Sequence, residues 1–209
     1  MDDLNRALEQ IGSIRRQVAR STEFRGYGPA TLGATGLLAV AAAGMQARLL
    51  PDAAVRIPAY LGIWITTAVL AAGLIGVHTY VRARRVHSGM ADEMLRIAVE
   101  QFLPAAAAGA LITYVLVHSA PATLWMLPGL WQVTFSLGVF SSCRFLPRPM
   151  AAAGVWYMMT GLFCLWLGDA RAFSPWAMGI SYGAGQLLVA GILLFNNREA
   201  GEAGGKHER

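Results

Sequence analysis

The sequence predicts an all-α integral membrane protein with six transmembrane helices. Of its 209 residues, 56% are hydrophobic and only 14% are charged, a composition that does not suit a soluble surface. Between Pro29 and Asn196 several windows of about 18 to 25 residues lack Asp, Glu, Lys and Arg, and a helix of that length crosses a hydrocarbon core of roughly 30 Å. These runs are continuously apolar, whereas the strands of a membrane barrel alternate between polar and apolar residues.

Polar breaks divide the apolar region into six expected spans, and the first begins too late to be a cleaved signal peptide. Each even-numbered span follows a proline near its outer end and carries a tryptophan soon after it. This repetition either groups the spans into three helical hairpins or reflects the abundance of such residues at membrane interfaces. The expected spans are residues 29–47, 58–81, 102–118, 124–145, 150–168 and 175–196, and the repeated pairs are Pro58 with Trp64, Pro128 with Trp131, and Pro175 with Trp176.

Basic residues set the expected orientation, because Lys and Arg near span ends accumulate on the cytoplasmic side. With both termini inside, fourteen basic residues lie in the inner segments, and only Arg48, Arg56 and Arg171 lie in the outer loops. The formal net charge of +5 is therefore a property of the inner surface, which suits an anionic inner leaflet. No compact basic patch is interleaved with aromatic residues, so nucleic acid is not an expected partner.

Two amphipathic segments are expected at the inner surface, in residues 1–27 and 88–103. Apolar side chains recur in both at helical spacing. Each stripe either lies on the inner leaflet or docks another helix or a partner protein. The candidate docking residues are Leu4, Leu8, Ile11 and Val18 in the first segment and Met90, Met94 and Ile97 in the second.

The second of these segments also holds an acidic group, which is better explained by structure than by catalysis. Glu100 is expected at the membrane interface, with Arg96 one turn back as its ion partner. Pro104 cannot donate to the carbonyl of Glu100, which permits a bend between the surface helix and the third span. Residues 197–209 have no apolar stripe and are expected to be a disordered cytoplasmic tail.

The six expected spans carry few residues that suggest ion transport, cofactor binding or catalysis. No span has a charged residue at mid-depth, as an ion-coupled transporter would need. His78 and His118 lie near opposite ends of their spans, so they are not expected to share a haem, and no metal-binding or catalytic motif is present. Cys143 and Cys164 differ in depth by roughly 15 Å, too far for a disulfide. We expect no enzymatic activity, no cofactor and no metal.

Four polar side chains are candidates for an interior lining: Gln132, Gln186, Tyr182 and His78. The two glutamines would be costly facing lipid, so both are expected to face the bundle interior, where they bond across helices or line a polar cavity. Small residues at four-residue spacing, such as Gly179 and Gly183, are expected to let helices approach closely within the bundle. A homo-oligomer that packs through the sixth span is the alternative.

Several segments resemble a group of bacterial inner-membrane proteins whose activity is not established. The segments are AVEQFLPA (98–105), LWMLPGLWQ (124–132), FSLGVFSSCRFLPRPM (135–150) and SPWAMG (174–179), preceded by RSTEFRGYGP (20–29). The resemblance implies a small multi-pass protein of the bacterial inner membrane. It supplies no functional residues.

Three functions are compatible with these observations. The first is a non-enzymatic accessory or regulatory protein that docks a cytoplasmic or membrane partner through its inner-surface helices. The second is a carrier or pore for a small neutral solute, lined by the four polar side chains. The third is an accessory subunit that holds a lipid, a quinone or a pigment.

Overall fold

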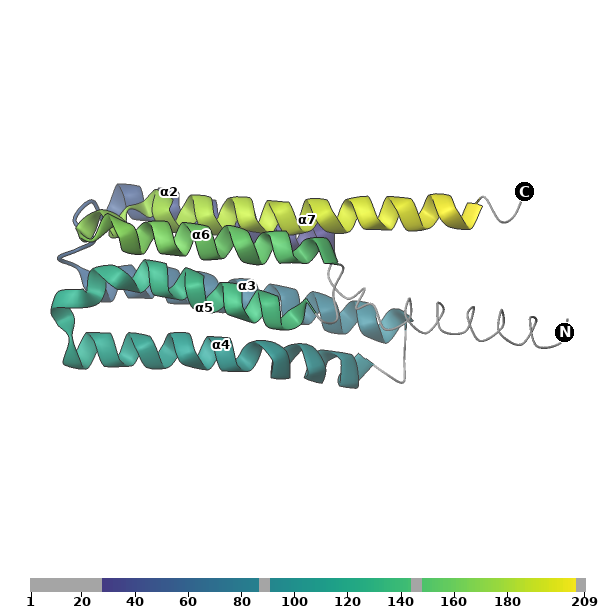
Figure 1. The fold of residues 1–209 in the computed structure, drawn as a ribbon, viewed down its shortest axis with the longest axis horizontal. Helices are drawn as coiled ribbons and strands as arrows, with labels where there is room; N and C mark the ends of the chain where they lie inside the picture. Colours follow the sequence, from purple (N-terminus) through teal and green to yellow (C-terminus); the bar gives the residue numbers. More distant parts are fainter. Residues whose placement is uncertain (1–27, 87–90, 144–147, 206–209) are drawn as a thin grey trace, which may run out of the picture.

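The computed structural model describes residues 28–86, 91–143 and 148–205, and these residues are all-helical without a strand (Figure 1). Short 3-10 helices, η1 (Pro121–Met126), η2 (Arg148–Met150) and η3 (Ala170–Phe173), lie between the longer ones. The long helices are α2 (Pro29–Leu49), α3 (Ile57–Val86), α4 (Ala91–Ser119), α5 (Leu127–Ser142), α6 (Ala151–Leu167) and α7 (Pro175–Gly205).

Four of these helices are long and apolar enough to cross a membrane. They are Pro29–Leu49, Ile57–Val81, Val99–Ser119 and Pro175–Phe195. The helix α6 is apolar but has only 17 residues, and α5 has 16. The predicted all-helical, membrane-type fold is confirmed at this level, and the count of six spans stays a prediction.

The helices lie side by side along one long axis (Figure 1). The connections 50–56, 120–126 and 168–174 lie together at one end, which we call the loop end. The helix α2 packs most extensively on α7, and α5 packs most extensively on α6. The tightest packing therefore does not follow the three hairpins weighed from the sequence.

Glycines permit the closest helix crossings. A Cβ atom at Gly129 of α5 would lie 2.7 Å from the carbonyl oxygen of Gly161 in α6, and one at Gly161 would lie 2.8 Å from the carbonyl oxygen of Gly129. A methyl group at Gly179 of α7 would collide with Ala43 of α2, and one at Gly183 would lie 2.8 Å from Val40. The predicted role of Gly179 and Gly183 in packing within the bundle is confirmed.

One segment differs from its prediction, and the bend that Pro104 would permit within α4 stays a prediction. The predicted surface helix 88–103 and third span are joined in one helix, α4, which contains Pro104. A proline in a membrane helix is tolerated where neighbouring groups satisfy the freed carbonyl. The predicted disordered tail is wrong up to Gly205, because α7 continues to that residue. Elongating a helix that is already nucleated is easier than starting one, and Arg198, Glu199 and Ala200 are good helix formers.

The two cysteines behave as predicted. Both Cys143 and Cys164 are free thiols, the first half-buried and the second buried. They lie near opposite ends of the bundle, one just after α5 and the other near the end of α6.

At the loop end, Asp169 caps η3 and pairs with Arg171. The carboxylate accepts hydrogen bonds from the Arg171 side chain at 2.9 Å and from its backbone N–H at 2.8 Å. These bonds, the side-chain one first, hold the pKa of the Asp169 carboxyl below its usual range. The stability that the pair adds is present above the ordinary Asp pKa and is lost as pH falls through the lowered value. Both side chains are exposed, so that contribution is small.

We expect Arg171→Gln to raise the pKa of Asp169 to the ordinary range of an exposed aspartate. An NMR titration of the Asp169 carboxyl carbon in the detergent-solubilised protein measures this. Arg56→Gln is the control, since Arg56 makes no ion pair with Asp169, and should leave the titration unchanged. An Asp169 pKa that does not move in Arg171→Gln would contradict the assignment.

Candidate functional site

Two contacts join α2 to α3, one towards each end of the bundle. The contact at the loop end is made by Gln46, which is 0% exposed. Its Nε2 donates to the carbonyl of Phe173 at 2.7 Å, and its Oε1 accepts from the indole N–H of Trp64 at 2.7 Å. Both polar ends of this buried amide are therefore satisfied, as burial requires. Through Trp64 and Phe173, Gln46 ties α2 to α3 and to η3.

The second contact lies near the other end of the bundle. There Gly28, Leu32 and Thr31 of the α2 start line a small cavity with Ile75, His78 and Thr79 of α3. A methyl group at Gly28 would collide with the ring of His78. The backbone and the imidazole are thus in direct contact, and they close the space between the two helices.

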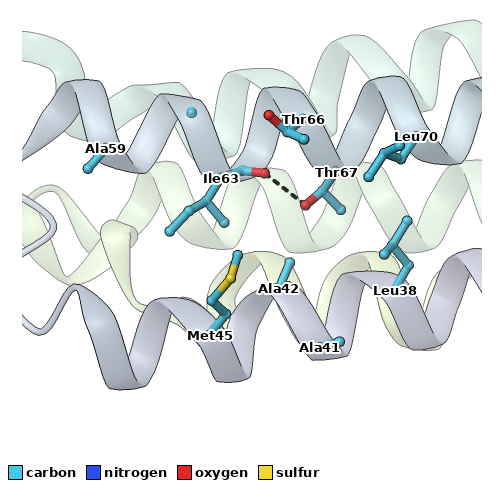
Figure 2. Close-up of a pocket in the computed structure, with 10 residues that line it drawn as sticks. Leu38, Ala41, Ala42, Met45, Ala59, Ile63, Thr66, Thr67 and Leu70 are labelled. Atoms are coloured by element: carbon cyan, nitrogen blue, oxygen red, sulfur yellow. Dashed lines mark hydrogen bonds between the residues drawn. The ribbon is translucent and has the colours of Figure 1, made fainter.

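The helices α2 and α3 also line a groove of about 510 Å³, shown in Figure 2. Its wall on α2 consists of Leu38, Ala41, Ala42 and Met45. Its wall on α3 consists of Ala59, Gly62, Ile63, Thr66, Thr67 and Leu70. We call this feature the α2–α3 groove.

Small side chains create the groove. Ala41 and Ala42 line the groove on α2 and Ala59 lines it on α3 (Figure 2). Gly62 also lines the α3 side, and a Cβ atom there would meet nothing within 4 Å. The hydroxyl of Thr67 donates to the carbonyl of Ile63 at 2.8 Å, so it offers little polarity to a ligand. The walls are therefore suited to an apolar occupant.

The groove has the length of about half a bilayer. From Ala59 to Leu70 the α3 wall rises by about 16 Å at 1.5 Å per residue, against a hydrocarbon core of roughly 30 Å. Ala59 is two residues after the start of α3, and Met45 is four residues before the end of α2. The groove therefore begins at the loop end and reaches the middle of the helices.

Aromatic side chains at the loop end support the groove from within. Tyr60 is 0% exposed. Its ring stacks on that of Trp131 in α5, with 6.4 Å between the ring centroids, and meets the ring of Phe173 edge-on, with 5.0 Å between the centroids. It belongs to the same buried cluster as Ala42 and Trp64. This packing holds the loop-end half of α3 in place, so the groove is built into the fold.

The structure places the predicted interior glutamines apart. Gln132 is 0% exposed, and its Nε2 lies 3.3 Å from the carbonyl of Ala177 and 3.5 Å from the sulfur of Cys164, while its Oε1 has no partner. Gln186 is half-buried, and its Cβ would lie 3.2 Å from a Cβ at Gly36. Gln132 therefore faces α6 and α7, and Gln186 faces α2.

The other two candidates do not join the glutamines in a common lining. Tyr182 is half-buried, and its ring lies 5.3 Å from each of Tyr157 and Phe135. His78 lies at the far contact between α2 and α3, roughly 25 Å along the axis from Gln132. Neither the groove nor the small cavity beside His78 is lined by Gln132, Gln186 or Tyr182.

The predicted docking residues belong to the two expected inner-surface segments. Leu4, Leu8, Ile11, Val18 and Met90 lie outside the described residues, and so do the side chains of Met94, Arg96 and Ile97. The backbone of the last three belongs to α4. Glu100 is exposed, and its pairing with Arg96 stays a prediction.

Sequence reasoning missed the residues that shape the groove. Gln46 is a single amide near the end of a charge-free span, which was a usable signal for an interhelical bond. The groove itself had no such signal, since alanine and glycine occur in every span. No family model, curated protein or solved structure matches the chain.

Proposed function

We propose that this chain is a non-enzymatic, six-span accessory protein of the bacterial inner membrane that holds an acyl chain of a membrane lipid in the α2–α3 groove. The proposal adopts the third of the functions weighed from the sequence. The observation that carries it is a preformed apolar groove, about half a bilayer long, on two helices that can each cross a membrane.

The behaviour of the polar groups supports membrane crossing by α5 and α6 as well. Three hydroxyls on these helices bond to their own helix backbone, which satisfies them in a bilayer. Thr134 donates to the carbonyl of Leu130 at 2.9 Å, Ser142 to Gly138 at 2.9 Å and Thr160 to Trp156 at 3.0 Å. Both helices also pack directly against a helix of membrane-crossing length, α5 against α4 and α6 against α7.

An acyl chain suits the groove better than a soluble ligand does. The walls carry no charged residue, and their polar atoms are two threonine hydroxyls and backbone. The groove faces outward, since Thr66, Gly62 and Met45 are exposed. In a bilayer such an opening faces lipid, so a chain can enter sideways without crossing water.

The two rival functions receive less support. A carrier lined by Gln132, Gln186, Tyr182 and His78 needs these side chains around one cavity, and they lie at separate places in the bundle. Partner docking through the inner-surface helices depends on side chains outside the described residues. It is compatible with lipid binding and forms a separate proposal, as does a homo-oligomer.

Filling the groove should prevent the chain from binding. Gly62→Phe places a large ring between the walls without a clash at its Cβ, so the fold should be retained. We expect affinity for phosphatidylcholine to fall about tenfold, which corresponds to roughly 1.4 kcal/mol of lost apolar contact. Native mass spectrometry of the detergent-purified full chain, titrated with the lipid, measures this.

Gly73→Phe is the matched control. Gly73 is also exposed on α3, and a Cβ there also meets nothing within 4 Å, but it does not line the groove. It should bind phosphatidylcholine as the unmodified chain does. Equal affinity in the two variants would refute the proposed function.

A further inference from the structure

We propose that the α2–α3 groove selects a phospholipid with an anionic headgroup, whose phosphate is held by Arg48 and Arg56 at the loop end. This inference rests on the proposed function and adds the chemical class of the ligand. The groove accounts for the acyl chain, and the two arginines account for the headgroup.

The helical register places one arginine above each wall. On α2, Arg48 is three residues after the wall residue Met45. On the other side, Arg56 directly precedes α3 and is three residues before the wall residue Ala59, whose N–H bonds to the Arg56 carbonyl at 3.0 Å. Residues three apart share a helix face. Arg48 thus continues the α2 face that lines the groove, and Arg56 lies just before the α3 wall.

Both arginines are available to a ligand. Arg48 and Arg56 are exposed, and the ion pair recorded at the loop end joins Arg171 to Asp169 instead. Within residues 48–56 the acidic member is Asp52, so two arginines and one aspartate leave that connection at net +1. Guanidinium groups bind phosphate with two parallel hydrogen bonds, and the site therefore complements an anionic headgroup.

The depth of the groove fits a single lipid. The wall begins about one turn from the arginines and extends for about 16 Å, half of the hydrocarbon core. A phosphate at Arg48 and Arg56 therefore lies at the height of the headgroups. The attached chain then runs from there to the middle of the bilayer, which is the path of a lipid in one leaflet.

Each arginine also has a simpler structural role, and the test must separate that role from headgroup binding. A cation in the last turn of α2 favours the helix dipole, and a basic residue beside a span anchors it at the membrane interface. Those roles affect folding and insertion. They do not produce a preference of the purified protein for one headgroup over another.

The experiment compares phosphatidylglycerol with phosphatidylcholine of the same acyl chains, by native mass spectrometry of the purified full chain. The unmodified chain should prefer the anionic lipid. In the Arg48→Gln, Arg56→Gln double variant, the ratio of the two affinities should fall about fivefold for each arginine removed. Its affinity for phosphatidylcholine should fall less, because the choline ammonium already balances the charge of the phosphate.

Two further variants keep the result interpretable. Arg171→Gln removes a loop-end arginine that is already paired with Asp169, and it should keep the preference. Arg48→Lys with Arg56→Lys retains the charge and should restore part of the preference, which a lost folding contact would not explain.

Several outcomes would overturn the inference. The headgroup is not held at this site if the glutamine double variant keeps its preference for phosphatidylglycerol. The same holds if Arg171→Gln loses as much of this preference as the double variant does. The proposal that the groove binds an acyl chain stands in both cases. If Gly62→Phe leaves phosphatidylcholine binding intact, the proposed function itself fails. If Gly62→Phe instead dissociates an oligomer, the groove holds a second copy of the chain.

Discussion

Replacing Gly161 with leucine should destabilise the bundle by about 3 kcal/mol, the upper range for a side chain forced into a packed interior. Gly161 is buried, and a Cβ there would lie 2.8 Å from the carbonyl oxygen of Gly129 and 2.9 Å from Val133. A backbone oxygen cannot rotate away as a side chain can. The helices α5 and α6 must therefore separate, and their mutual packing is lost.

Thermal unfolding in detergent, followed by circular dichroism and by loss of monodisperse protein, measures this effect. Gly73→Leu is the matched control, because Gly73 is exposed and a Cβ there meets nothing within 4 Å. That variant should unfold at or slightly above the temperature of the unmodified chain, since leucine favours a helix more than glycine does. Equal melting of the Gly161 and Gly73 variants would contradict the described crossing of α5 and α6.

Replacing Gln46 with leucine should have the next largest effect, a loss of about 2 kcal/mol. The substitution removes two hydrogen bonds of 2.7 Å and leaves the indole N–H of Trp64 and the carbonyl of Phe173 buried without a partner. Each orphaned buried group costs about 1 to 3 kcal/mol in soluble proteins, and interhelical bonds in membranes contribute up to roughly 1.7 kcal/mol each.

Gln132→Leu is a closely matched control for this prediction. Gln132 is also a glutamine with 0% exposure, but its bond to Ala177 is long, at 3.3 Å, and its carbonyl oxygen is unpaired. Removing an unsatisfied group offsets the loss of weak bonds, so we expect a change within about 0.5 kcal/mol. A larger loss in Gln132→Leu than in Gln46→Leu would show that the loop-end contact is assigned wrongly.

The helical class of the fold was predictable because lipid-length apolar runs have few alternatives. The starts of α2 and α7 were also predictable, since Pro29 and Pro175 stand at the first position of their helices, where proline is favoured. The separation of Cys143 and Cys164 followed from helix rise alone. These predictions use local features of the chain, and local features can be read from one sequence.

The partners of each helix were not predictable in the same way. A small residue such as Gly36 or Gly129 allows a close crossing but does not specify which helix crosses there. The packing of α2 on α7 joins segments at opposite ends of the chain. The groove depends on such pairings, because its lining comes from two helices, with Ala41 on α2 and Gly62 on α3.

One local prediction failed for a different reason. The extension of α7 to Gly205 concerns a helix that is already nucleated. The polar composition of a tail is a weak signal against the propagation of such a helix. Gln46 was visible in the sequence but was not among the residues expected to face the interior.

The most direct test of the central claim is photo-crosslinking in bilayers with phosphatidylglycerol that carries a diazirine in the middle of its acyl chain. Mass spectrometry of the cleaved protein maps the adducts. We expect them to concentrate on groove residues such as Met45, Ile63 and Thr67, and to disappear from these in Gly62→Phe. Adducts spread evenly over exposed leucines outside the groove, such as Leu74, Leu103 and Leu111, would contradict a lipid site between α2 and α3.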